Sequence, residues 1–225
     1  DGYGSDRPGL GEAIDGWLGL MSKDDLPAVV MAAIGESIAV KERLLVDGVA
    51  ARLSTMAETA AAAIAGGGKI LLCGNGGSAA DAQHLAGEFL VRLRPSLNRE
   101  ALPALSLITD SSTLTACAND YGYDQIFARP LRALGRRGDV LLAITTSGNS
   151  INILAALDVA KNQGLACLGF LGGSGGKALT LCDQAIAVPS DDINRIQESH
   201  IMLGHVLVQA IEELLLAQGH ISLES

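Results

Sequence analysis

The stretch Lys69-Ile-Leu-Leu-Cys-Gly-Asn-Gly-Gly-Ser-Ala79 decides the fold of this chain. The apolar residues that follow Lys69 form a short run of the kind found in strands buried on both faces. A glycine turn comes next, and a helix-compatible segment begins at Ser78. Glycines at 66–68 end the helical pattern that precedes the run. The stretch therefore predicts a buried strand, a tight turn and a helix.

Further apolar runs of the same kind follow, each separated from the next by a helix-compatible segment. They are Ala104–Ile108, Val140–Ile144, Leu165–Leu171 and Gln184–Val188. Parallel strands need crossover connections, and helices supply them. We therefore expect an α/β fold with a five-stranded parallel sheet flanked by helices, of the flavodoxin-like type. The chain ends in an amphipathic helical stretch over residues 195–218.

The N-terminal part has a different pattern. Over residues 26–65 the apolar positions recur at helical spacing, and Gly48 breaks the pattern, so we predict a helical hairpin. Residues 1–25 are rich in glycine and acidic residues around Trp17, and we treat them as an extension without an assigned function. Residues 26–225 are then expected to form a single domain, because a chain of this length fits one hydrophobic core.

Composition excludes several classes of function. A net charge of -9 argues against a nucleic-acid surface, which needs clustered Lys and Arg. We find neither an uncharged apolar run of about 18 residues nor a basic segment leading into an apolar one, so no membrane span or signal peptide is expected. The four cysteines lie in apolar runs and form no C-x-x-C pair. Such thiols are typical of a reducing compartment, and we expect a cytoplasmic protein.

In parallel sheets, ligands bind beyond the carboxyl ends of the strands. The turn over residues 74–79 can hold a phosphate or a sugar on free backbone N–H groups, or it can be a structural turn that needs glycine. Gly74, Gly76 and Ala79 also satisfy a dinucleotide-binding fingerprint. That fingerprint expects an acidic residue about 20 positions later, and Asp110 comes too late.

A second turn, Thr145-Thr146-Ser147-Gly148-Asn149-Ser150, brings hydroxyl groups and the start of a helix together. Hydroxyls and backbone amides can satisfy the oxygens of a phosphate monoester, and the helix dipole favours its charge. A helix N-cap by Ser150 would explain only one of these hydroxyls. We therefore favour phosphate binding.

Histidines offer a candidate metal site. His84 and Glu88 are four residues apart on one helix, where they form either half of a zinc site or an ordinary surface pair. Considered alone, the surface pair is favoured. In the last helix Gln197 and His205 lie roughly 80° apart, so both can face the strand ends. His200 points away from His205 and is assigned to the surface or to an interface. The remaining histidine, at position 220, is expected in solvent.

Together these segments resemble the SIS-domain family of sugar isomerases, and within it the phosphoheptose isomerases. The resemblance extends over residues 41–214. It is carried by Cys-Gly-Asn-Gly-Gly-Ser-Ala-Ala-Asp-Ala-Gln-His (73–84) with Glu88, Ala-Asn-Asp-Tyr-Gly-Tyr-Asp (118–124), Thr-Ser-Gly-Asn-Ser (146–150), and Arg-Ile-Gln-Glu-Ser-His (195–200) with His205. Without it, the Asn-Asp-Tyr-Gly segment is by default a helix stop.

The resemblance implies the site residues. The phosphosugar would be bound by Asn75, Gly76, Gly77, Ser78, Glu88, Asn119, Asp120, Thr145, Thr146, Ser147, Ser150 and Gln197. One zinc ion per subunit would be held by His84, Glu88, Gln197 and His205. Gln is an uncommon zinc ligand, so its assignment rests on the family. The family also implies a homotetramer with active sites near subunit contacts.

The implied reaction is an aldose-ketose shift through an enediol, from sedoheptulose 7-phosphate to D-glycero-D-manno-heptose 7-phosphate, with Glu88 as base and His205 as acid. Two departures from the family pattern are Thr145, where Ser is usual, and Asn194, where some members have Asp. The alternatives are a non-catalytic SIS protein that binds a replication initiator and lacks the full metal set, and an SIS isomerase of another sugar phosphate.

Overall fold

The computed structural model describes residues 25–108 and 110–224 of the chain. Of the predicted N-terminal extension, residues 1–25, all but residue 25 lie outside this description. The chain divides into residues 1–39 and a compact unit of residues 40–225, and each part is described by itself. The expectation of one domain from residue 26 onward stays a prediction.

Two helices occupy the N-terminal segment: α2 (Leu26–Val46) and α3 (Val49–Ala65). The helices themselves were predicted, whereas their packing as a hairpin stays a prediction. Between them Gly48 has φ of 72°, a left-handed conformation that glycine adopts without steric cost. The break predicted at Gly48 is therefore confirmed.

The five predicted strands are present and form one parallel sheet. They are β1 (Ile70–Gly74), β2 (Ala104–Ser106), β3 (Val140–Thr145), β4 (Ala166–Gly172) and β5 (Gln184–Val188). Their order in the sheet is β2-β1-β3-β4-β5. In the register, Ile70 lies opposite Ala104 on one side and Val140 on the other. The edge strand β2 is shorter than predicted, because it has a neighbour on one side only and pairs with β1 over three residues.

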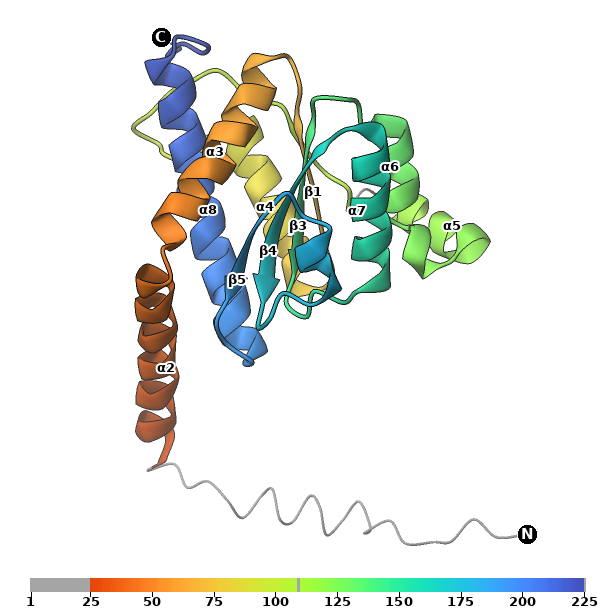
Figure 1. Cartoon of the computed structure of the whole chain (residues 1–225). Coiled ribbons are helices and arrows are strands. Elements are labelled where there is room, and N and C mark those ends of the chain that lie inside the picture. Colours follow the sequence, from red (N-terminus) through yellow and green to blue (C-terminus); the bar gives the residue numbers. More distant parts are fainter. Residues whose placement is uncertain (1–24, 109, 225) are drawn as a thin grey trace, which may run out of the picture. The chain divides into compact units, whose positions relative to one another are not determined.

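Helices cover both faces of the sheet (Figure 1). The connecting elements are α4 (Gly77–Leu90), α5 (Ser111–Tyr121), η2 (Tyr123–Gln125), α6 (Ala128–Leu134), α7 (Ile151–Gln163), η3 (Lys177–Thr180) and α8 (Ile193–Ala217). Ile70 and Leu72 of β1 pack in a core with α3, α4 and α8. Leu71 and Cys73 pack in a second core with α6 and α7. Burial on both faces explains why this strand is apolar throughout.

The strand order defines where a ligand can bind. From β1 the chain crosses outward to β2, and it then returns to form β3 on the other side of β1. The connections after β1 and β3 thus leave in opposite directions, which opens a crevice at the carboxyl ends of these two strands. The glycine turn and the hydroxyl turn both lie at this crevice.

Among the described residues, one helix, α8, is long and apolar enough to cross a membrane by length and composition. Its apolar side chains, including Leu203, Leu207 and Ile211, are buried in the core beneath the sheet. The composition of α8 is therefore that of a core helix.

Candidate active site

The glycine turn after β1 is shaped by close contacts that exclude side chains. A Cβ atom on Gly74 would lie 2.4 Å from the main-chain oxygen of Ser78. Gly76 has φ of 56° and immediately precedes α4. Glycine is therefore structurally required at both positions. The N–H groups of Ser78 and Ala79 donate within the turn, to the main-chain oxygens of Asn75 and Gly76.

An amide pair joins the two turns. Asn75 Nδ2 donates to Asn152 Oδ1 at 2.9 Å, and Asn152 Nδ2 donates back to Asn75 Oδ1 at 2.8 Å. Asn152 lies in α7 and is buried, and Tyr123 adds its hydroxyl as a donor to Asn75 Oδ1 at 3.2 Å. Sequence reasoning missed Asn152 and Tyr123 as members of the site. In the sequence, the only feature that points to Asn152 as a site residue is its position two residues after the hydroxyl turn.

Some side chains of the hydroxyl turn form hydrogen bonds within the turn itself. Thr145 is buried, and its hydroxyl accepts a hydrogen bond from Gly148 N at 3.2 Å. Ser147 Oγ accepts from Asn149 N at the same distance. Ser150 precedes α7, but in the part of the chain that the structure describes its hydroxyl makes no capping hydrogen bond. The hydroxyl of Ser150 therefore remains available to a ligand.

A cavity of about 280 Å³ lies beside the hydroxyl turn. Thr146 and Ser147 line it, together with Ser174 after β4 and with Ser190 and Asp191 after β5. These last three residues were not predicted as site residues, although each follows the carboxyl end of a strand. A larger cavity, about 630 Å³, lies at the amino ends of the strands, away from every predicted site residue.

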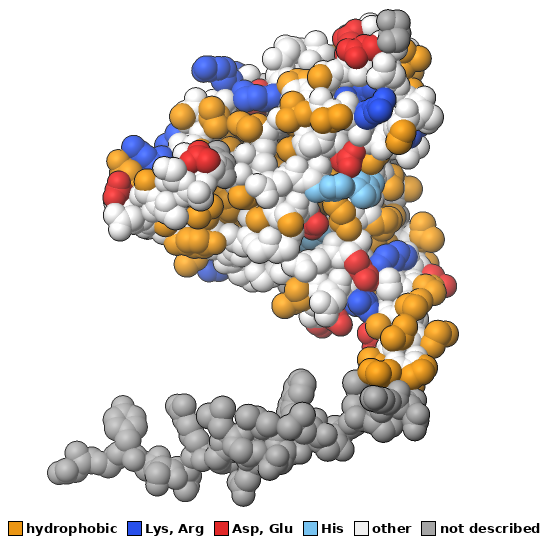
Figure 2. Space-filling model, turned by 180° about the vertical axis from the view of Figure 1, so that it is seen from behind, with side chains coloured by type: hydrophobic (Ala, Val, Ile, Leu, Met, Phe, Trp, Pro, Cys, Tyr) orange, Lys and Arg blue, Asp and Glu red, His pale blue; other side chains and the backbone are white. Residues whose placement is uncertain are grey.

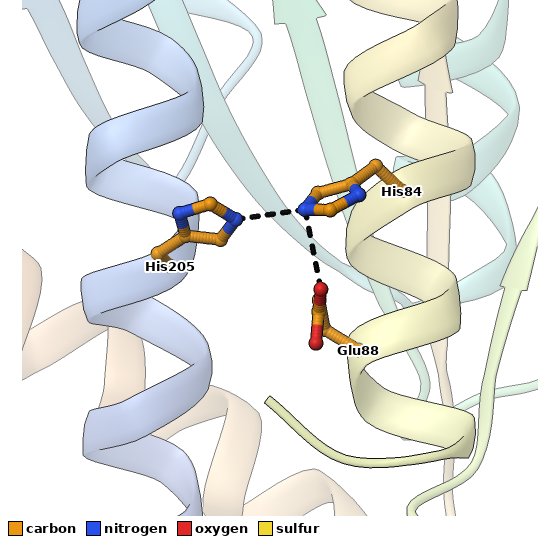
Figure 3. Close-up of side chains that lie close together, drawn as sticks. All are labelled: His84, Glu88 and His205. Carbon is orange, nitrogen blue, oxygen red and sulfur yellow. Dashed lines mark hydrogen bonds and ion pairs between the residues drawn. The ribbon is translucent and has the colours of Figure 1, made fainter. Parts of the chain in front are cut away.

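His84, Glu88 and His205 converge between α4 and α8 (Figure 3). His84 Nε2 lies 2.8 Å from His205 Nε2 and 3.2 Å from Glu88 Oε1. The side chain of His84 is 49 % exposed, whereas that of Glu88 is 19 % exposed. Figure 2 shows histidine side chains reaching the surface together, with acidic and apolar side chains nearby.

The donor set of this cluster suits a metal ion. Two nitrogen lone pairs and a carboxylate oxygen face one another, with all ligand atoms within 4.8 Å. A proton on His84 Nε2 can serve only one of its two neighbours, whereas a cation can be shared by all three groups. Tetrahedral ligands about 2.0–2.1 Å from a zinc ion lie roughly 3.3 Å from each other, close to the spacing found here.

Gln197, the fourth predicted ligand, lies at the other end of α4. A Cβ atom on Gly77 would lie 2.6 Å from Gln197 Nε2, so this side chain covers the first turn of α4. Its amide is therefore in contact with the glycine turn predicted to bind the substrate.

Asp81 is a further acidic group near the cluster. It precedes His84 by one helical turn, and its Oδ2 is buried without a hydrogen-bond partner among the described residues. Burial raises the pKa of Asp81, and the neighbouring His84 acts in the opposite direction. The sequence gave no reason to separate this aspartate from an ordinary helical one.

The surface assignment of His200 is wrong. Its side chain is fully buried and stacks on Phe170, and its Nε2 lies 2.9 Å from Leu171 O. A carbonyl only accepts, so Nε2 carries the proton. Nδ1 is buried and has no partner among the described residues. Burial lowers the pKa of His200 to about 4, and the bond to Leu171 raises it less. His220 is exposed, as expected.

Asn119 and Asp120 lie at the end of α5, where the predicted helix stop is confirmed by Gly122 with φ of 95°. Asn119 Nδ2 donates to Asp120 Oδ1 at 2.8 Å, and both residues are exposed. The hydrogen bond that links this region to the glycine turn comes from Tyr123.

Comparisons with known proteins agree with this geometry. The family model described as SIS domain matches residues 36–172. A phosphoheptose isomerase of Pelodictyon phaeoclathratiforme is 48% identical over 88% of this chain and 93% of its own length. One from Aneurinibacillus thermoaerophilus is 47% identical over 87% of this chain and 98% of its own. The structure of phosphoheptose isomerase GmhA from Neisseria gonorrhoeae is similar with a TM-score of 0.78 and 40% identity, covering 84% of this chain and 99% of that one.

Proposed function

The chain belongs to the SIS-domain family and, within it, to the phosphoheptose isomerases, and from this premise we propose how its residues carry out the reaction. The enzyme is an aldose-ketose isomerase of heptose biosynthesis that interconverts sedoheptulose 7-phosphate and D-glycero-D-manno-heptose 7-phosphate. The observation that carries the mechanism is the convergence of His84, Glu88 and His205.

Glu88 is the proposed base and His205 the proposed acid. In the ketose-to-aldose direction Glu88 takes a proton from C1 and returns it to C2, while His205 protonates the C2 oxygen and recovers a proton from the C1 hydroxyl. Both side chains come from neighbouring helices and meet at His84. The result is a transfer of hydrogen between two adjacent carbons with no net loss of atoms.

The same cluster is the proposed zinc site, with His84, Glu88 and His205 as ligands. Gln197, the fourth ligand that the family implies, lies against Gly77 here, so its side chain would have to turn toward the cluster to reach the ion. When bound, zinc would polarise the substrate oxygens and favour the enediolate. Glu88 directs Oε1 toward His84, and a carboxylate has a second oxygen that can take the proton.

The phosphosugar is proposed to bind at the crevice between β1 and β3, on the remaining predicted residues. They are Asn75, Gly76, Gly77, Ser78, Asn119, Asp120, Thr145, Thr146, Ser147 and Ser150. The distance to the cluster supports a seven-carbon substrate. From Gly77 to His84 α4 rises by about 10 Å. A chain from C1 to a phosphate on C7 spans roughly 9–10 Å, at about 1.2 Å per bond. A pentose phosphate would be shorter by two bonds.

We also propose a homotetramer. The support lies in α2, which exposes apolar side chains along its length: Val29, Val30, Met31, Ile34 and Ile38, between 48% and 68% exposed. Contiguous exposed apolar side chains are typical of an interaction surface. A cytoplasmic location belongs to the same proposal, because the four cysteines are free thiols and three of them are buried.

The proposed function is tested by conversion of sedoheptulose 7-phosphate by the purified protein, before and after chelation and again with zinc restored. We expect turnover that falls on chelation and returns with zinc. Turnover that is indifferent to zinc would remove the metal from the mechanism but keep the isomerase. No turnover in any arm would refute the substrate assignment, and a pentose phosphate assayed in parallel would identify the nearest alternative.

A further inference from the structure

A buried ion pair lies below the catalytic cluster. Arg99, in the loop after α4, and Glu212, in α8, have side chains that are 0% and 1% exposed. Arg99 Nε donates to Glu212 Oε1 at 2.7 Å, and Arg99 Nη2 lies equally close to the same oxygen. Both charged groups are therefore shielded from solvent. Burial of a charge costs desolvation free energy unless specific hydrogen-bond and ion-pair partners compensate it.

The other donors of Arg99 bind the C-terminal end of α4. Arg99 Nη2 donates to the main-chain oxygen of Glu88 at 2.8 Å, and Nη1 donates to that of Phe89 at 2.7 Å. The last carbonyls of a helix have no partner within the helix. Arg99 supplies that partner, and one of its acceptors belongs to the proposed catalytic base.

Glu212 connects this cap to the helix that carries His205. The two residues are seven positions apart in α8, about two turns, so they lie on nearly the same side of the helix. Closer to the cluster, α4 and α8 touch directly: a Cβ atom on Gly204 would lie 2.5 Å from Leu85 Cδ1. Two contacts at different heights fix both the separation and the angle of a helix pair.

We propose that the Arg99–Glu212 pair is a positioning element of the isomerase site, which holds α4 and α8 so that Glu88 and His84 meet His205. The Leu85–Gly204 contact is apolar and allows sliding, whereas the guanidinium fork has fixed directions toward Glu88 and Glu212. Misplacement of reacting groups by about 1 Å can cost about a hundredfold in rate. The pair touches no reacting atom and acts through the helices.

The chain offers a matched control at the amino ends of β1 and β3, where the paired residues hold neither α4 nor α8. Lys69 Nζ lies 2.6 Å from Asp139 Oδ2, and the side chain of Asp139 is 3% exposed. Glu212→Gln and Asp139→Asn each replace a buried, paired carboxylate by its amide. Both variants are expected to lose thermal stability, because each leaves a cation with a weaker partner.

Only Glu212→Gln is expected to lower kcat, by about 10- to 100-fold, and to weaken Zn²⁺ binding by a similar factor, as outer partners of ligand groups typically do. KM should change little, since the phosphate crevice lies at the far end of α4. The double variant Arg99→Met/Glu212→Leu removes both charges and keeps the measurement possible if Glu212→Gln does not fold. Values of kcat and Zn²⁺ affinity within twofold of the Asp139→Asn control would overturn the proposal.

The inference rests on the proposed roles of Glu88 and His205, and the experiment separates the two. A wild-type protein without turnover of sedoheptulose 7-phosphate would refute those roles. A loss of Zn²⁺ affinity confined to the Arg99–Glu212 variants would still support positioning. Wild-type turnover with unchanged variants would refute positioning alone.

Discussion

Acid is predicted to destabilise this protein through His200. The folded state holds the ring neutral, with a pKa lowered by burial from 6.5 to about 4. Protonation would place an N–H at Nδ1, which has no acceptor among the described residues. Below pH 6.5 the unfolded chain therefore binds a proton that the folded chain does not, and stability falls as the pH falls from 6.5 to 4. Above 6.5 this group has no effect.

The magnitude follows from the two pKa values. Between pH 8 and pH 5 the linkage amounts to about 2 kcal/mol of unfolding free energy, and the full shift corresponds to about 3 kcal/mol near pH 4. The matched variant is His200→Gln, whose Nε2 can still donate to Leu171 O and which does not titrate. Since the carboxylates titrate alike in both proteins, their contribution cancels in the difference.

The assay is denaturant unfolding of both proteins at pH 8, 6 and 5. The wild type is expected to lose about 2 kcal/mol more than His200→Gln between pH 8 and pH 5. Equal losses in the two proteins, within about 0.5 kcal/mol, would refute the argument that a buried neutral histidine links folding to pH.

Three substitutions test the site. Glu88→Gln should lower kcat by about 10²- to 10⁴-fold while circular dichroism shows a folded protein, and retained turnover would contradict its role as base. Asn152→Leu removes both amide hydrogen bonds of Asn75 and leaves it only the Tyr123 hydroxyl. It should raise KM about tenfold with a smaller change in kcat, so an unchanged KM would remove the amide pair from substrate binding. Gly148→Ala places a Cβ 2.0 Å from Gly175 O at a positive φ. It should cost about 3 kcal/mol, and a thermal midpoint equal to wild type would show that the turn can move.

The fold could be predicted from the sequence because its signals are local. Each strand is a continuous apolar run, and the intervening segments are long enough for crossover helices, so the parallel sheet follows. The candidate metal cluster could be predicted only in part, because spacing alone favours a surface pair and the zinc assignment came from the resemblance to the SIS-domain family. His84 and Glu88 share a helix face by spacing, and His205 is one of few histidines in the chain.

Contacts between elements could not be predicted in this way. Asn152 and Arg99 stand in ordinary polar surroundings in the sequence, and their roles depend on partners 77 and 113 residues away. His200 is different, because its spacing in the sequence is that of a buried residue. It precedes Leu207 by seven residues and Ile211 by eleven, which puts it on the buried stripe of α8.

The half-exposed position of His84 has a consequence for isotopes. In one protomer the cluster is open to the medium, so a hydrogen taken up by Glu88 can exchange with water before it returns to carbon. Turnover in heavy water would then introduce deuterium at C2 of the aldose. If a neighbouring subunit covered the cluster and excluded water, the base would instead return the original hydrogen from C1 to C2. The amount of deuterium in the product therefore reports how well the enzyme protects its intermediate from solvent.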